Sequence, residues 1–213
     1  MKKLIYLVAF VATITLASCE KLTIGEPYQE GIILTNIQKL DGTYTITGPH
    51  GFFYQGQSLT APTQGEYNAY FINQKVDGNV CKIDGKRPTY LGTTKFTVTT
   101  PSQTEKISVP ISQITCEFKF KVDDSIEILG ILLSGTSDKI FVDDGQFVDN
   151  SPTKELVGDQ YNNDIHVIAS KMEIQITIRT SEPKYVVLTK EIDAQPAHCY
   201  AVKIGKNGIH ISE

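Results

Sequence analysis

The sequence predicts an all-β protein built as an antiparallel β-sandwich. Three observations carry this prediction. Apolar and polar residues alternate over several short runs, Asx-Gly pairs separate these runs, and no stretch beyond the first 18 residues shows the apolar repeat of an amphipathic helix. Alternation by two gives each strand one dry face and one wet face, and frequent tight turns favour short strands stacked in two sheets.

The predicted strands share an apolar residue at every second position. The clearest run, residues 114–122, places Cys116 and Phe118 on its dry face, so Cys116 is expected to be a buried structural thiol. Residues 126–133 are apolar on both faces, which is typical of a central or doubly covered strand. In chain order the other alternating runs are 66–73, 95–100, 107–111, 172–179 and 199–204.

Turn signals divide the chain between these runs. Asp-Gly or Asn-Gly pairs occur at 41–42, 77–78, 84–85, 144–145 and 207–208, and the last pair predicts a closing hairpin. Residues 143–164 are rich in Asp, Asn and Gly. This segment is expected to be either a long surface loop or a join that splits the fold into two small sub-domains.

The N-terminus carries an export signal. Lys2 and Lys3 precede the apolar run 4–16, which is too short to span a bilayer comfortably, and small residues precede Cys19. The sequence Leu-Ala-Ser-Cys at 16–19 resembles the bacterial lipoprotein box, which implies cleavage before Cys19 and lipid on its thiol, for example palmitate. The alternative is an ordinary signal peptide with a coincidental cysteine. We therefore expect a signal peptide at 1–18, a lipidated cysteine and tether at 19–30, and a β-sandwich module at 31–213.

The charge balance narrows the classes of partner. The chain carries a formal net charge of −4, and removal of Lys2 and Lys3 with residues 1–18 makes it −6. An acidic balance argues against nucleic acid and against electrostatic docking on anionic lipid. Attachment to the membrane is therefore expected through the lipid on Cys19, at the outer membrane or cell surface. Stable anchoring of that kind requires more than one acyl chain.

Three cysteines remain after lipidation, namely Cys81, Cys116 and Cys199. Export permits disulfides, and no Cys-x-x-Cys spacing suggests zinc or thioredoxin-type chemistry. With Cys116 assigned to a strand interior, the only disulfide to consider joins Cys81 to Cys199. Free thiols at both positions are the alternative.

Few residues suggest a binding site. Phe52, Phe53 and Tyr54 lie between glycines and form the candidate contact patch, with packing in the core or on a sheet face as the alternative. Asp143, Asp144 and Asp164 supply oxygen ligands that would suit calcium. The EF-hand order is missing, however, and Asx-rich turns give the same composition without an ion. No catalytic motif, metal-binding histidine spacing or cofactor motif occurs, so no enzyme is expected.

Four stretches together resemble the fimbrillin-like adhesins of anaerobic gut and oral bacteria, a family that includes pilus subunits and their lipoprotein anchors. They are the lipobox at 16–19, the Gly-Glu-Tyr-Asn-Ala-Tyr strand at 65–70, Val-Pro-Ile-Ser at 109–112 and the closing residues 198–203. The resemblance implies a transthyretin-like β-sandwich on the outer membrane with a structural or adhesive role.

Polymerising subunits of that family are cut at a basic site to free a groove for a donor strand. The only basic pair after Cys19 is Lys86-Arg87, and the following Pro88 disfavours cleavage. We therefore expect an adhesive or fimbrial-accessory surface lipoprotein, of anchor or tip type, whose partners are fimbrial subunits or a host or glycan ligand. The alternative is a glycan-binding lipoprotein of a nutrient-uptake complex, and a hydrolase is a third, less favoured alternative.

Overall fold

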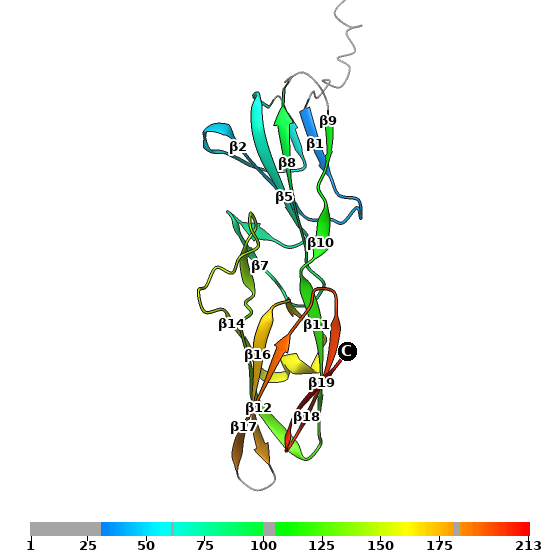
Figure 1. Cartoon of the computed structure of the whole chain (residues 1–213), viewed down its shortest axis with the longest axis vertical. Helices are drawn as coiled ribbons and strands as arrows, with labels where there is room; N and C mark the ends of the chain where they lie inside the picture. The colour runs from blue at the N-terminus through cyan, green and yellow to red at the C-terminus, as the bar shows by residue number, and fades with distance from the viewer. Residues whose placement is uncertain (1–30, 61, 100–104, 181–183) are drawn as a thin grey trace, which may run out of the picture.

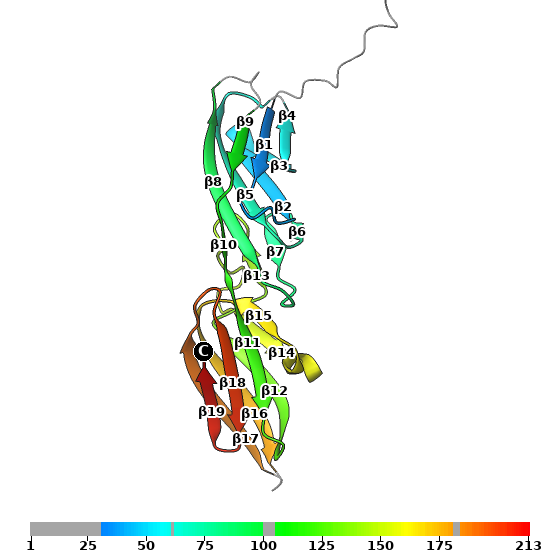
Figure 2. The same ribbon diagram turned by 90° about the vertical axis from the view of Figure 1, so that its right-hand side faces the viewer.

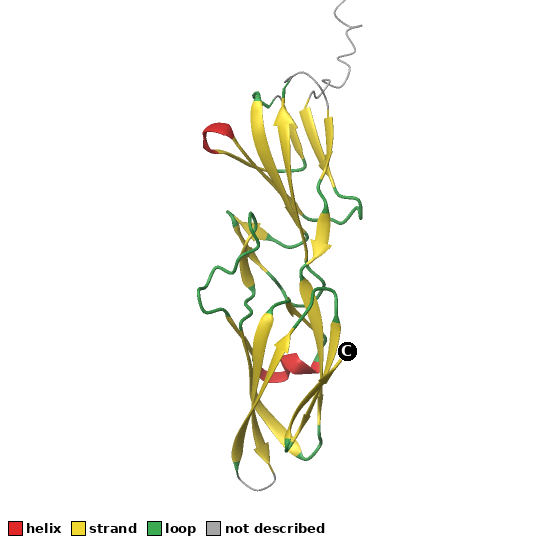
Figure 3. Cartoon of the chain, viewed as in Figure 1, coloured by secondary structure: helices red, strands yellow, loops and turns green. Residues whose placement is uncertain are grey.

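The computed structural model describes residues 31–60, 62–99, 105–180 and 184–213, and these residues are almost entirely β (Figure 3). Two short 3₁₀ turns, η1 (Pro49–Gly51) and η2 (Gly158–Asn162), are the helical elements within these ranges. Residues 1–30, with the predicted signal peptide, Cys19 and the tether, lie outside the described residues. No helix in the described part of the chain has the length and apolar composition needed to cross a membrane.

The strands form two sandwiches that lie end to end along the long axis of the molecule (Figure 1). In the N-terminal sandwich a sheet in the order β4-β1-β9 faces a sheet in the order β10-β8-β5-β2-β3. The core between them includes Leu34, Ile46, Tyr67 and Phe71. Its strands are β1 (Gly31–Thr35), β2 (Thr43–Gly48), β3 (Phe52–Gln55), β4 (Ser58–Thr60), β5 (Gly65–Ile72), β8 (Tyr90–Val98), β9 (Glu105–Ser108) and β10 (Ile111–Gln113).

The C-terminal sandwich places the sheet β15-β11-β18-β19 over the sheet β14-β12-β16-β17 (Figure 2). Phe118, Ile176 and Val202 belong to its core. The pairs β1–β9 and β11–β18 are parallel and the other pairs of the two sandwiches are antiparallel. Its strands are β11 (Thr115–Val122), β12 (Ile126–Ser134), β14 (Thr153–Leu156), β15 (Ile165–Ile168), β16 (Lys171–Thr180), β17 (Tyr185–Asp193), β18 (Cys199–Gly205) and β19 (Gly208–Ser212).

The alternating runs lie in strands as the pattern predicts, except that 107–111 divides between β9 and β10. Cys116 and Phe118 on β11 are fully buried, as are Ile174, Ile176 and Ile178 on β16. Residues 126–133 are apolar at both even and odd positions, but not because both faces of the strand are covered. The register between β12 and β16 slips between Ile128 and Gly130. This β-bulge adds one residue and moves the apolar phase from even to odd positions, so that the next core residue is Ile131. β12 is central in its sheet, but its outer face is uncovered, since Leu129 is exposed.

A small third sheet joins the two sandwiches. The hairpin β6 (Val76–Asp77) and β7 (Val80–Lys82) lies between β5 and β8 in the chain, whereas β13 (Lys139–Phe141) lies between β12 and β14. β13 pairs antiparallel with β7, so each sandwich contributes to one sheet. Beneath it lies a shared hydrophobic cluster, here called the junction core: Ile72, Cys81, Ile83, Ile140, Val142 and Ile168.

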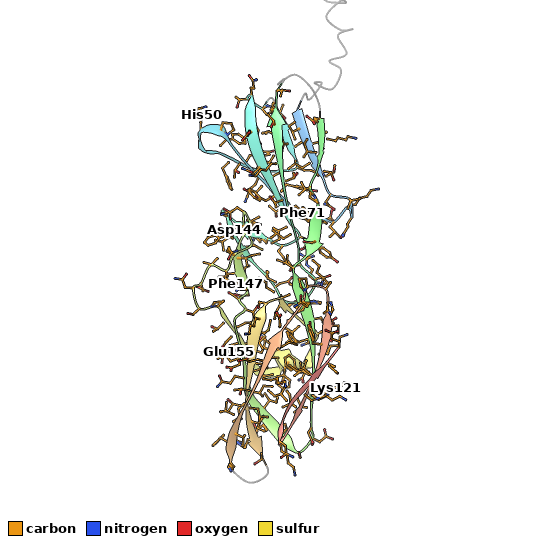
Figure 4. The ribbon with its side chains drawn as sticks, viewed as in Figure 1. His50, Phe71, Lys121, Asp144, Phe147 and Glu155 are labelled. Carbon is orange, nitrogen blue, oxygen red and sulfur yellow. The ribbon has the colours of Figure 1, made fainter. Side chains whose placement is uncertain are left out.

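The chain passes from one sandwich to the other at residues 113–115, so of the two alternatives for residues 143–164, a surface loop or a join between sub-domains, the join is excluded. This segment lies within the C-terminal half and begins with a turn beside the junction (Figure 4). Asp144 Oδ1 accepts a hydrogen bond of 2.8 Å from Gln146 N, and Gly145 adopts a φ of +72°. The Asx-Gly composition therefore makes a tight turn after β13, and Phe147 then packs on the junction core.

The pairing of β7 with β13 predicts a specific cross-link. Cys81 lies opposite Ile140, and opposed residues of an antiparallel pair lie within disulfide reach. Burial, followed by the charge of Asp84, raises the pKa of Cys81 to about 12, so the bond has to be formed during oxidative refolding. In the Ile140→Cys variant, Cys81 and the introduced cysteine should form a disulfide. Neither thiol should then react in a thiol titration under denaturing conditions. Phe141→Cys is the control, because position 141 faces the other side of the sheet, and both thiols should remain free in this variant. A disulfide in Phe141→Cys and none in Ile140→Cys would show that the register is wrong.

The core of the C-terminal sandwich gives a second prediction. Phe118→Asp buries an unpaired carboxylate among apolar side chains and should lower the free energy of unfolding by roughly 4 kcal/mol or more. Lys121→Asp changes an exposed residue of the same strand and should stay within about 1 kcal/mol of the unsubstituted chain. Chemical denaturation followed by circular dichroism measures both. Equal stability of the two variants would contradict the assignment of the buried face.

Candidate functional site

The predicted aromatic patch lies on β3, an edge strand of the N-terminal sandwich. Phe52 is partly buried and meets Tyr67 edge to face, with ring centroids 5.9 Å apart. Phe53 is 50% exposed and Tyr54 is 37% exposed. Two of the three predicted residues therefore remain available at the surface, whereas Phe52 packs on the core. Tyr54 lies over Gly56, where a Cβ atom would come within 2.5 Å of the Tyr54 hydroxyl.

A second apolar surface crosses the outer face of the C-terminal sandwich, and we name it the apolar strip. In the sheet, Gly130 lies opposite Thr177, and Thr177 lies opposite Val187. Tyr185 follows on β17, with the Arg179 guanidinium 5.6 Å from its ring centre. The strip comprises Leu129, Val157, Tyr185 and Val187, whose exposed fractions lie between 41% and 64%.

The sequence contained a signal for part of this strip. The apolar outer positions of 126–133 would need covering if the strand were doubly buried, but the structure leaves Leu129 exposed. Monomeric proteins seldom expose grouped apolar side chains without a contact role. Tyr185 and Val187 belong to β17 and Val157 follows β14, so only the fold brings them onto one sheet with Leu129.

The apolar strip and β3 belong to different ends of the molecule. The chain enters the described structure at Gly31, at the end of the N-terminal sandwich that points away from the C-terminal one (Figure 1). The loop side of β16 and β17, where Tyr185 begins β17, lies at the opposite end. A tether attached at Gly31 would therefore leave the apolar strip on the side away from the attachment point.

The cysteines do not form the disulfide considered above. Cys81 is buried in the junction core, Cys199 is exposed on β18, and both are free thiols. Burial raises the pKa of Cys116 to about 12, which agrees with a structural thiol. The pKa of Cys199 is also raised, first by partial burial and then by its hydrogen bond to Glu117, so this exposed thiol is not activated either.

The predicted calcium ligands have local partners. Asp144 accepts the turn hydrogen bond from Gln146, and an Asp164 carboxylate oxygen lies 3.4 Å from Lys119 Nζ. Among the described residues, no group of three or more His, Cys, Asp or Glu side chains is arranged to hold a metal ion. The structure thus does not bring Asp143, Asp144 and Asp164 together as one site.

The basic pair Lys86-Arg87 lies in the loop between β7 and β8. Arg87 donates a hydrogen bond of 3.0 Å to the Asn73 carbonyl and lies 3.7 Å from Asp84. Cleavage here would cut the N-terminal sandwich between two of its internal strands and would free no terminal strand. Strand β1 is moreover central in its sheet, paired with both β4 and β9.

Comparison with known proteins places this fold beside those of bacterial surface proteins. No protein-family model and no curated protein matches the sequence. Among solved structures, the chain is similar to the fimbrial anchor protein Mfa2 from Porphyromonas gingivalis, with a TM-score of 0.50, 9% identity and coverage of 85% of this chain and 95% of Mfa2. A candidate adhesin from Bacteroides ovatus has a TM-score of 0.50 and 8% identity, with 86% and 92% coverage. A fimbrial assembly protein from Parabacteroides distasonis gives 0.48 and 9%, with 85% and 93% coverage. At these identities the similarity is one of fold.

Proposed function

We propose that this chain is a lipid-anchored structural protein of the bacterial surface, acting as an accessory or anchor of a fimbria or adhesion apparatus. The observation that carries the proposal is the double-sandwich fold. It matches the fold of a fimbrial anchor protein over 85% of this chain and 95% of that protein. The lipobox at 16–19 supplies an independent reason to place the chain at the membrane.

The shape supports a role in holding a partner away from the membrane. A tether made of residues 19–30 spans at most about 40 Å when fully extended. It joins the N-terminal sandwich at Gly31, so the C-terminal sandwich and its apolar strip project outward (Figure 1). The junction sheet keeps this projection stiff, because strands from both halves pair within it.

The role proposed is non-enzymatic. The exposed surfaces include grouped apolar side chains and sheet edges, which suit protein contacts. The thiols of Cys81 and Cys116 have raised pKa values, and on β11 Lys119 pairs with Glu117 at 3.2 Å. The partners that fit these surfaces best are fimbrial subunits.

Affinity purification from the source bacterium tests the proposal. A C-terminally tagged full-length chain, purified after mild cross-linking of intact cells, should bring fimbrial subunits with it. Tyr185→Ser combined with Val187→Ser should lower their recovery at least about fivefold, since apolar anchors dominate protein interfaces. Lys121→Ser and Lys203→Ser, exposed positions of the other sheet, form the matched control. Absence of fimbrial subunits at normal expression would contradict the proposal.

The anchoring step has its own prediction. Cys19→Ala removes the thiol that would carry the lipid and should move the protein from the membrane fraction to the soluble fraction. Immunoblots of fractionated cells measure the shift, and Cys199→Ala, which removes a different cysteine, exposed on β18, should leave the distribution unchanged. Unaltered membrane partitioning of Cys19→Ala would show that the lipobox is not used.

A further inference from the structure

Two adjoining hollows at the junction of the sandwiches are lined by lysines. The first, of about 590 Å³, lies between the loop 84–86 and the segment around η2. The second, of about 960 Å³, lies over the exposed face of β6, β7 and β13. Asp84 lines both, so the two hollows meet there, and we name them together the junction groove. Five lysines line it: Lys75, Lys82, Lys86, Lys139 and Lys154.

These lysines form no close ion pairs. Among the described residues, none of the five has a carboxylate oxygen within 4 Å of its amine. Two of the carboxylates in the groove are committed elsewhere, since Asp84 pairs with Arg87 and Asp164 pairs with Lys119. With five lysines against Asp77, Asp84 and Asp164, the lining of the groove carries a formal charge of +2 on a protein whose net charge is −4.

The placement of the lysines works against stability. Lys82 lies directly opposite Lys139 in the β7–β13 pair, and like charges at opposed positions destabilise a sheet. Lys154 is half-buried, and burial lowers its pKa. The positive charge of nearby Lys82 also lowers this pKa, whereas the negative charges of Asp138 and Asp84 act to raise it. Residues that break a local rule without internal compensation are concentrated at functional sites.

The groove is also held in shape before any ligand binds. The Gly85 carbonyl accepts a hydrogen bond of 2.9 Å from His166 N, which ties the loop of one sandwich to a strand of the other. Asp84 Oδ1 accepts one of 2.9 Å from Lys86 N. Gly85 has a φ of +70°, and a Cβ atom there would lie 3.5 Å from Lys154 Nζ, so the loop packs closely against that amine. A preformed site avoids the ordering cost of binding.

We propose that the junction groove binds an anionic saccharide, with sugar carboxylate or sulfate groups on the lysines. The amide groups of Gln160 and Asn163 line the first hollow beside Lys86 and Lys154. Gln160 Oε1 accepts from Val157 N, which leaves its amide N–H groups for a ligand. The Asp77 carboxylate lines the second hollow and has no ion pair within 4 Å among the described residues, so it can accept hydrogen bonds from sugar hydroxyls.

The lining favours a saccharide polymer over nucleic acid. No aromatic side chain lines either hollow within the described part of the chain, whereas single-stranded nucleic acid needs such stacking platforms. Two lysine-lined hollows that share Asp84 offer several cationic contacts, which suits a polymer that carries repeated anionic groups. The groove does not depend on the proposed fimbrial role, and either could fail alone.

Calorimetric binding to the full-length chain in detergent tests the proposal with three probes. Oligogalacturonate carries carboxylates, dextran sulfate carries sulfates, and dextran is uncharged. At least one polyanion should bind and dextran should not, and the affinity should fall as salt rises. Lys154→Met should weaken binding about tenfold, and Lys82→Gln with Lys139→Gln should weaken it further. Lys95→Gln with Lys190→Gln removes the same charge elsewhere and should change Kd less than about twofold.

The outcomes separate cleanly. Preference for one polyanion identifies the charged group, and equal binding of both assigns recognition to the anion itself. The Lys82→Gln, Lys139→Gln variant should melt at or above the temperature of the unsubstituted chain, since it removes a repulsion. If any of these variants unfolds, binding is measured instead with Lys86→Gln, which changes an exposed lysine of the groove. Failure of both polyanions to bind, or an equal loss in the Lys95, Lys190 control, would overturn the proposal.

Discussion

The pairing of β7 with β13 fixes the two sandwiches relative to each other. Each strand comes from a connection within a different sandwich, so neither half can complete this sheet alone. The junction core beneath it buries four isoleucines, and a fully buried aliphatic side chain contributes about 1.5–3 kcal/mol. Only one segment, between β10 and β11, connects the two sandwiches along the chain, and by itself it would let them move relative to each other. The free energy gained by burying the junction core opposes that motion. The length of the molecule and the position of its surfaces follow from this contact.

Both proposals depend on the same constraint. A flexible joint would let the C-terminal sandwich fold back toward the tether, and the apolar strip would lose its outward position. The junction groove would lose its form as well, because Lys82 belongs to one sandwich and Lys139 and Lys154 belong to the other. Stiffness at the junction therefore serves a display role and also creates a site that neither half contains.

Local patterns predicted the strands well because alternation by two is a local property. Residues 114–122 and 172–179 became β11 and β16 with the expected buried faces. The run at 107–111 reads as one strand, yet it divides into β9 and β10 in different sheets, since Pro110 cannot donate to a ladder. The division of the fold and the bulge after Ile128 depend on long-range pairing, which periodicity does not encode. The surfaces depend on long-range pairing as well, because Lys82 lies opposite Lys139, and Leu129 and Val187 share one sheet, only after the strands have paired.

Cross-linking mass spectrometry on intact cells tests the central claim most directly, namely that the outward C-terminal sandwich holds a fimbrial partner. Lys184, which directly precedes β17, and Lys190 on β17 flank Tyr185 and Val187 of the apolar strip in the sequence, whereas Lys95 lies on the N-terminal sandwich. The account predicts cross-links from Lys184 or Lys190 to a fimbrial subunit, and few or none from Lys95. Fimbrial cross-links confined to Lys95, with none from β17, would contradict it.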